Sequence, residues 1–162
     1  SLLRHLRSLN MPKVEFQAEI SSQTRSRWGD DKVEFFLSPN VGEHKVSIRD
    51  CASGGELSRV MLAIQALLAG KENIPTLVFD EIDSNIGGET ASVIGEKLRE
   101  IGEKHQLICI THFPQVARKA QHHLQIYKQE KEGRTLTLVK NLDEISREQE
   151  LLRMAGGYTE TH

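Results

Sequence analysis

Two adjacent carboxylates end a short apolar run near the middle of the chain. The run spans residues 76–79, and Asp80 and Glu81 follow it directly. An apolar run of this length without alternation suits a strand that is buried on both faces of a parallel sheet. Acids at the carboxyl end of such a strand lie where open α/β sheets bind ligands. One acid can hold a divalent cation while the next orients or deprotonates a water, although a strand followed by a solvated acidic turn has the same pattern.

A histidine follows a second apolar run further along the chain. Residues 107–111 form that run and His112 ends it, while residues 89–102 between the two runs carry apolar residues at helical spacing. Strand, helix and strand of these lengths predict a βαβ unit with parallel strands. We therefore expect Asp80, Glu81 and His112 at one edge of one sheet. A single histidine after a strand is usually a surface residue, but the edge that it shares with two acids favours a role in a site.

Two glycines open a third segment that can bind an anion. Ser53-Gly54-Gly55-Glu56 precedes an apolar stripe at helical spacing over residues 57–68. Ser53 and Glu56 fit a capping box, which predicts that Ser53 begins the helix. Capping does not require glycine, whereas glycines at a helix start let another group approach the free backbone N–H donors, and the helix dipole favours an anion there. The segment predicts either a phosphate seat or a plain glycine-rich turn before a capped helix.

The remaining segments predict a mixed α/β chain. Alternating apolar residues indicate half-buried antiparallel strands, and apolar residues at helical spacing indicate amphipathic helices. We expect a helix over residues 2–9, strands over 14–20 and 33–37 joined by a polar loop over 21–31, a short strand over 45–49, a helix from 114 to about 121, a hairpin from 124–129 and 135–142, and a helix over 143–155.

The composition is that of a globular protein without a strong charge bias. The chain has 162 residues, of which 38% are apolar and 27% charged, and its net charge is −2. No apolar run approaches the ~20 residues that cross a bilayer, and no basic excess indicates nucleic-acid binding. Cys51 and Cys109 are far apart, so we expect Cys109, inside an apolar run, to be a buried free thiol in a reducing compartment. Because the first residue is serine rather than methionine, we expect a fragment or a processed chain.

Taken in order, these segments resemble the motifs of ABC-type ATPases. Residues 53–56 resemble the signature motif, residues 77–81 Walker B with its adjacent catalytic glutamate, residues 82–85 the D-loop, and His112 the switch histidine. Four segments are similar to those of the RecN family of SMC-like DNA repair ATPases: Ala-Ser-Gly-Gly-Glu-Leu-Ser-Arg, Phe-Asp-Glu-Ile-Asp, Ile-Thr-His-Phe-Pro-Gln-Val-Ala and Met-Ala-Gly-Gly. The resemblance covers nearly all of the chain and is far more specific than any one motif.

The chain departs from this family at three points. Asn85 stands where the family's loop after Walker B often has glycine, and Phe113 stands where leucine is common. The phosphate-binding sequence Gly-x-x-x-x-Gly-Lys-Ser/Thr (Walker A) does not occur in the 162 residues. In the family that segment lies ahead of the coiled coil, so the resemblance implies that this chain carries half of an ATP site.

The resemblance also implies a fold and its boundaries. The fold is α/β, the C-terminal half of an ABC-type (P-loop NTPase-like) ATPase head, with a mostly parallel sheet flanked by helices, short antiparallel strands and a C-terminal hairpin. Residues 1–10 would end a coiled-coil arm, and residues 11–162 would form the C-terminal portion of the head. The missing N-terminal half of the same protein would complete it.

The family's catalytic roles fall on three residues. Asp80 would help to hold Mg²⁺, through the water shell of the ion, because Mg²⁺ dehydrates reluctantly. Glu81 would position and polarise the water that attacks ATP. His112 would contact the γ-phosphate and sense its presence.

The family's ATP-binding roles fall on the glycine-rich segment and the D-loop. Ser53, Gly54 and Gly55 would stabilise charge on a phosphoryl group held by a second head, and Glu56 completes the signature motif. Asp83 would lie at the contact between the two heads, which ATP holds together as a homodimer. DNA would be a partner in double-strand break repair and recombination, in the cytoplasm at the nucleoid, and no membrane is expected.

Two other functions remain open at this point. A metal-dependent phosphoesterase could use Asp80, Glu81, Asp83 and His112, although such sites usually need further carboxylates or histidines. A non-catalytic module that only dimerises or docks is the other alternative. We expect the isolated chain to bind in this way and to hydrolyse no ATP until the missing half is supplied.

Overall fold

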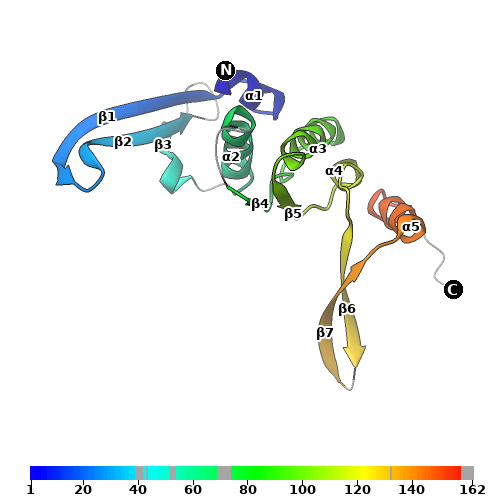
Figure 1. The fold of residues 1–162 in the computed structure, drawn as a ribbon. Helices are drawn as coiled ribbons and strands as arrows, with labels where there is room; N and C mark the ends of the chain where they lie inside the picture. Colours follow the sequence, from blue (N-terminus) through cyan, green and yellow to red (C-terminus); the bar gives the residue numbers. More distant parts are fainter. Residues whose placement is uncertain (39–41, 43, 52–53, 69–73, 132, 158–162) are drawn as a thin grey trace.

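A computed structural model describes residues 1–38, 42, 44–51, 54–68, 74–131 and 133–157 of the chain. A row of helices over a small sheet forms its body, and two hairpins project from it (Figure 1). None of the helices in these ranges is long and apolar enough to cross a membrane. The elements are α1 (Leu2–Ser8), β1 (Glu15–Ser26), β2 (Gly29–Ser38), β3 (Val46–Ser47), the 3-10 turn η1 (Ile48–Asp50), α2 (Gly54–Leu68), β4 (Thr76–Phe79), α3 (Gly88–Gly102), β5 (Gln106–Cys109), α4 (Pro114–Ala117), β6 (Leu124–Lys131), β7 (Arg134–Asn141) and α5 (Glu144–Met154).

The βαβ unit predicted from the two apolar runs is confirmed. β4 and β5 pair in parallel, from Thr76 opposite Gln106 to Phe79 opposite Cys109, and α3 connects them. The prediction that such a strand is buried on both faces is wrong for this chain. One face of the pair packs on the helices, whereas on the other face Val78, Ile108 and Ile110 are 63%, 47% and 52% exposed.

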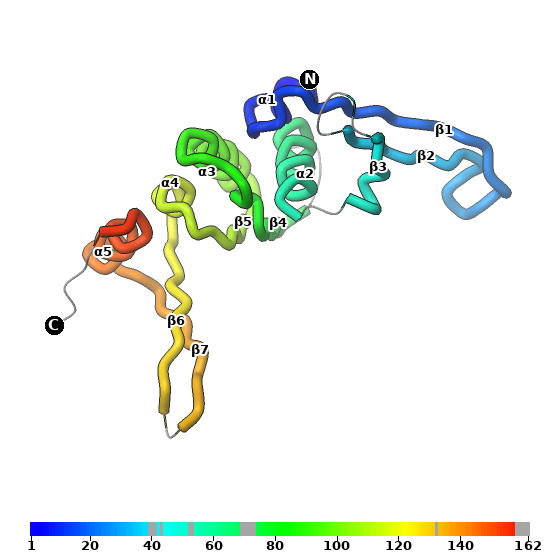
Figure 2. The backbone as a smooth tube through the Cα atoms, turned by 180° about the vertical axis from the view of Figure 1, so that it is seen from behind, coloured from blue at the N-terminus to red at the C-terminus, as the bar shows by residue number. Residues whose placement is uncertain are grey.

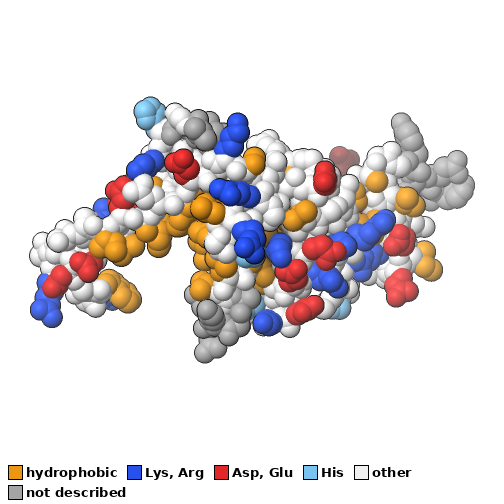
Figure 3. Space-filling model, turned by 90° about the horizontal axis from the view of Figure 1, so that it is seen from above, with side chains coloured by type: hydrophobic (Ala, Val, Ile, Leu, Met, Phe, Trp, Pro, Cys, Tyr) orange, Lys and Arg blue, Asp and Glu red, His pale blue; other side chains and the backbone are white. Residues whose placement is uncertain are grey.

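The N-terminal hairpin extends through the segment that was predicted to be a loop. β1 continues to Ser26 and β2 begins at Gly29, so residues 21–31 mostly belong to the paired strands. The polar side chains there are exposed, and backbone pairing needs no apolar alternation when no face is buried. Apolar side chains gather along this arm (Figure 3), and Phe16 stacks on Phe35 with ring centroids 5.5 Å apart.

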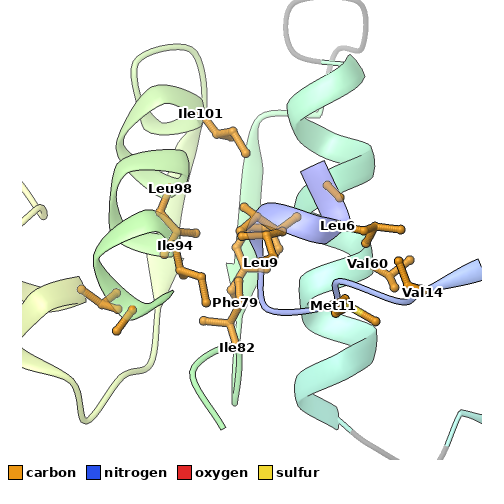
Figure 4. Packing of buried hydrophobic residues seen from close by; sticks show 14 of the residues in the cluster. Leu6, Leu9, Met11, Val14, Val60, Phe79, Ile82, Ile94, Leu98 and Ile101 are labelled. Atoms are coloured by element: carbon orange, nitrogen blue, oxygen red, sulfur yellow. The ribbon is translucent and has the colours of Figure 1, made fainter. Parts of the chain in front are cut away.

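The core lies where α1, α2 and α3 meet β4 (Figure 4). Leu6 and Leu9 of the N-terminal segment are 0% and 1% exposed, so this segment packs inside the body. Val60 of α2 and Ile94 of α3 are both fully buried and point toward the same cluster. Burial of apolar side chains is the main stabilising term of such a cluster.

The C-terminal part forms a separate hairpin and helix beside α4 (Figure 2). The β6–β7 hairpin and α5 agree with the predicted segments, and the Asp143 carboxylate caps α5 by accepting from the Ser146 amide at 2.8 Å. The prediction of a helix from 114 to about 121 is wrong, because α4 ends at Ala117. Arg147 of α5 donates to the carbonyl oxygens of Arg118 and Ala120 at 2.9 and 2.6 Å, which satisfies carbonyls that a longer helix would use internally.

Replacing a buried helix residue by alanine measures the contribution of core packing to stability, as distinct from the contribution of helix propensity. Ile94→Ala removes a fully buried side chain, and we expect the free energy of unfolding to fall by about 2–5 kcal/mol. Ile145→Ala on α5 is the matched control, because Ile145 is 76% exposed, and we expect a change within about 0.5 kcal/mol. Urea unfolding followed by circular dichroism measures both. Equal losses for the two variants would contradict the core assignment.

Candidate functional site

The two carboxylates leave β4 at its carboxyl end and are both exposed. Asp80 follows Phe79 directly, and its Oδ1 accepts a hydrogen bond from the Glu81 amide at 2.9 Å. Glu81 has a φ of 55°, in the left-handed region that costs a non-glycine residue on the order of 1 kcal/mol. The turn is held by the Ser84 amide, which donates to the Glu81 carbonyl at 3.0 Å. Two exposed acids therefore stand side by side on a constrained turn.

The structure places His112 at the same edge as these acids, as the parallel strands predicted. The Ile110 amide donates to the Phe79 carbonyl at 2.9 Å, so the chain after β5 runs level with Asp80 and Glu81. The His112 side chain is 72% exposed. Its ring lies 4.6 Å from the ring of Phe113, tilted by 53°. The rim thus carries two carboxylates and an accessible imidazole.

Asp83, in the segment that resembles the D-loop, is enclosed within its own chain. Its side chain is only 2% exposed, and its place at a contact between two heads stays a prediction. Asp83 Oδ2 instead accepts from the Thr111 hydroxyl and, at 3.2 Å, from the His112 amide. A buried carboxylate needs such donors, because its desolvation is otherwise costly. Asp83 therefore connects the loop after β4 to the loop after β5 within one chain.

The glycine-rich segment opens α2 beside the acidic turn, and its two glycines differ. Ser53 lies outside the described residues, while Gly54 is exposed and Glu56 is half-buried. Gly55 is buried, and access of a neighbour's nucleotide to its amide stays a prediction. A Cβ at Gly55 would overlap Ser84 Oγ and lie 3.0 Å from the Glu81 carbonyl oxygen. Gly55 is thus required by the close approach of the acidic turn, and Gly54 alone of the two presents an accessible helix start.

Two residues of α2 that the sequence analysis did not single out hold the acidic turn in place. The Ser58 hydroxyl donates to the Asp80 carbonyl at 2.7 Å. Arg59, 5% exposed, donates to the carbonyls of Ile82 and Ser84 at 3.4 and 3.0 Å. Burial lowers the pKa of the Arg59 guanidinium, and the nearby Glu56 carboxylate partly offsets this. One feature of the sequence could have indicated this role. Arg59 is a charged residue on the same side of α2 as the buried Gly55.

The half-buried thiol of Cys109 lies close to the same carboxylates. Burial, followed by the charges of Asp83 and Asp80, raises the pKa of Cys109 to about 12, so the thiol stays protonated near neutral pH. Among the described residues Cys109 forms no disulfide, as predicted, although its side chain is half-buried rather than fully buried. In the described ranges no group of three or more histidine, cysteine or acidic side chains is arranged to hold a metal ion by itself. The exposed carboxylate of Asp80 offers oxygen ligands, the kind that a hard divalent cation prefers.

The chain is similar to curated proteins named DNA repair protein RecN. It is 44% identical over 154 residues to the protein of Vibrio cholerae serotype O1, a match that covers 94% of this chain and 28% of that protein. It is 40% identical over 170 residues to the protein of Bacillus subtilis strain 168, covering 95% of this chain and 30% of that protein. The chain therefore spans less than a third of the length of these relatives. No family profile matches it.

Solved SMC heads share the fold at low sequence identity. The Smc head domain with a coiled coil and joint from Pyrococcus yayanosii superposes with a TM-score of 0.64 at 19% identity, covering 95% of this chain and 28% of that one. A second structure, from work on ATP-driven dimerization and DNA-stimulated activation of SMC ATPases, gives a TM-score of 0.51 at 18% identity, covering 98% of this chain and 92% of that one. The predicted α/β fold of an ATPase head segment is thereby confirmed.

The close packing at Gly55 is testable without any ligand. Gly55→Ala places a Cβ against the acidic turn, and we expect a loss of about 1–3 kcal/mol in the free energy of unfolding. Combining it with Ser84→Ala removes the overlapping hydroxyl and should recover part of that loss. Gly102→Ala is the control, because its Cβ would meet only Leu107 Cβ, at 4.0 Å, and alanine favours a helix. If thermal unfolding showed the two single variants to be alike, the packing role would have to be abandoned.

Proposed function

We propose that this chain, which is RecN-like over nearly its full length, supplies half of a composite ATP site in a DNA repair ATPase. The observation that carries the proposal is the convergence of Asp80, Glu81 and His112 on one rim, next to the start of α2. Two acids, an accessible imidazole and an open helix start suit phosphoryl transfer, in which positioning and charge stabilisation provide most of the catalysis.

Each exposed group of the rim has a role that its chemistry allows. Mg²⁺, when bound with ATP, would neutralise developing phosphate charge, and Asp80 would hold it, as oxygen ligands suit this ion. Glu81 accepts a hydrogen bond from the attacking water and orients it toward the γ-phosphate. His112 contacts the phosphate that is transferred. Water attacks the γ-phosphorus, the bond from that phosphorus to the β-phosphate oxygen breaks, and ADP and phosphate leave, with the proton that the water loses passing to the released phosphate.

The same chain also contributes to a second nucleotide. Gly54, which follows Ser53 in the sequence, opens α2, and the N-terminus of a helix favours an anion. We infer that it binds the ATP held by a second copy, so that ATP joins two heads. ATP-driven dimerization is named for the SMC ATPases whose fold this chain shares. Gly55 takes part through packing against the acidic turn rather than through its own amide.

The remaining length of the protein is proposed to supply the phosphate-binding loop. The chain spans 28% of the Vibrio cholerae relative, and its own sequence has no Walker A motif. The open face of β4 and β5 supports this, because Val78, Ile108 and Ile110 leave an apolar sheet face exposed. Beside it lies a shallow hollow of about 230 Å³, lined by Leu57, Met61 and Val78 among others. A covering sheet from the rest of the head would bury both.

DNA repair enters the proposal through the relatives. The curated proteins are named DNA repair proteins, and we propose the same process, including double-strand break repair and recombination, for this chain. The similarity to RecN favours ATP hydrolysis over a metal-dependent phosphoesterase. A docking module describes the behaviour that we propose for the isolated chain rather than for the complete protein.

Completing the head should switch on hydrolysis. We expect no ATP turnover from the 162-residue chain alone, because it lacks a cradle for the phosphates. Co-expression with the remaining segment of the same gene should produce ATPase activity, measured as phosphate release. Turnover by the chain alone that disappears on Glu81→Gln would overturn the half-site proposal.

Glu81 should be needed for the chemical step and not for nucleotide binding. In the completed protein, Glu81→Gln keeps the side-chain size but removes the charge that polarises water, and we expect kcat to fall by about 100-fold or more. ATP affinity, measured by fluorescent-nucleotide titration, should change little. Glu103→Gln is the control, because Glu103 is an exposed acid at the end of α3, away from the rim. An unchanged kcat for Glu81→Gln would refute its assignment.

A further inference from the structure

The buried Asp83 carboxylate is aimed at one residue of the rim. Its Oδ2 accepts from the His112 amide at 3.2 Å and from the hydroxyl of Thr111. Its Oδ1 lies 3.5 Å from Nδ1 of the His112 ring. The Thr111 hydroxyl in turn accepts from the Phe113 amide at 3.0 Å. One oxygen of the Asp83 carboxylate thus faces the His112 backbone and the other faces the His112 ring. The Asp83 side chain is 2% exposed, whereas that of His112 is 72% exposed.

This arrangement selects which ring nitrogen carries the proton. A carboxylate only accepts hydrogen bonds, so the ring nitrogen that faces it is favoured as N–H. The tilted contact with Phe113 limits the ring from a second side. Nδ1 therefore faces Asp83 Oδ1 at 3.5 Å, and Nε2 remains for other partners.

We propose that Asp83 is a positioning residue that holds His112 with Nδ1–H toward its carboxylate and presents Nε2 to the nucleotide. The inference rests on the proposed function, in which His112 contacts the γ-phosphate. Nε2 of the neutral ring accepts a hydrogen bond from water. That water can donate its second hydrogen to a phosphate oxygen, so the neutral ring reaches the γ-phosphate through it.

The contact also connects two parts of the rim. Asp83 lies two residues after Glu81, on the turn that Ser58 and Arg59 hold against α2. Any displacement of this turn therefore moves the carboxylate that orients His112. Glu81 and His112 are thus set by one loop, and Asp83 acts on catalysis through His112 without contacting substrate.

Asp83→Asn provides the test, because asparagine has nearly the same shape. Its Oδ1 can still accept from Thr111 and the His112 amide, which turns its NH₂ donor toward Nδ1 of the ring. We expect the neutral His112 ring to change from mainly Nδ1–H to mainly Nε2–H. Two-bond ¹H–¹⁵N correlation spectra of the ¹⁵N-histidine-labelled 162-residue chain, recorded well above the titration range of histidine, distinguish these tautomers. Loss of the signal in His112→Gln assigns it.

Thr111→Val is the matched control for a merely structural role. It removes the hydroxyl donor to Asp83 but leaves the carboxylate opposite Nδ1, so we expect lower stability with the Nδ1–H tautomer retained. A ring that is mainly Nε2–H in the wild-type chain, or a tautomer that Asp83→Asn leaves unchanged, would overturn the proposal. This result depends on the isolated chain only, so it stands apart from ATP hydrolysis.

The completed protein gives a second readout. Asp83→Asn should lower kcat by about 10–100-fold, the range typical of removing an outer partner that orients a functional histidine, with the KM for ATP nearly unchanged. If His112→Gln left ATP hydrolysis unaffected, the proposed role of His112 in hydrolysis would be wrong. The tautomer measurement would still decide whether Asp83 positions the His112 ring. If His112→Gln abolished hydrolysis but Asp83→Asn left kcat unchanged, the positioning inference would fail and the proposed function would stand.

Discussion

The parallel pairing of β4 with β5 is the constraint on which the candidate site depends. Strands that run in the same direction end at the same edge, so the chain after Phe79 and the chain after Cys109 leave the sheet side by side. α3 makes this possible by crossing over between the two strands, with Ala91, Ile94 and Leu98 buried against the core. Residues thirty positions apart in the sequence thereby lie at one rim. Strand direction places them there, so no direct contact between side chains of the two strands is required.

The acidic turn at that rim is held on both sides by buried polar groups. On one side Arg59 donates to the carbonyls of Ile82 and Ser84, and on the other side Asp83 accepts from Thr111 and His112. Removing either partner would leave a buried polar group unsatisfied, which is more costly than the net gain of one hydrogen bond. These hydrogen bonds therefore hold the turn both to the start of α2 and to the loop that carries His112.

Such coupling has a consequence for a site shared between two copies. In the proposed arrangement, α2 of each head faces a nucleotide held by the other copy, while Glu81 and His112 of that head face its own nucleotide. Ser58, Arg59 and the close approach at Gly55 join the helix start rigidly to the acidic turn. In that arrangement, a contact made at one nucleotide would reach the groups that act on the other through packed groups rather than through a flexible segment.

The sequence by itself determined the elements that carry the chemistry. Two apolar runs flanking a helical segment predicted the βαβ unit, and hence the shared edge of Asp80, Glu81 and His112, because periodicity and strand direction are local properties of the chain. The pattern of apolar residues failed to predict the paired strands over residues 21–31, which have no buried face. It also predicted too long a helix at residues 114–121, where Arg147 of α5 binds the carbonyls that follow α4.

Only the tertiary structure decided the roles of Gly55, Arg59 and Asp83. A motif shows that these residues stand beside the site, but their burial depends on which segment packs over them. Gly55 is covered by the acidic turn, Arg59 is drawn into the core by carbonyls more than twenty residues away, and Asp83 is enclosed by the loop after β5. Such hydrogen-bond partners come together only when segments that are distant in the sequence pack against each other. The spacing of residues along the sequence does not specify that packing.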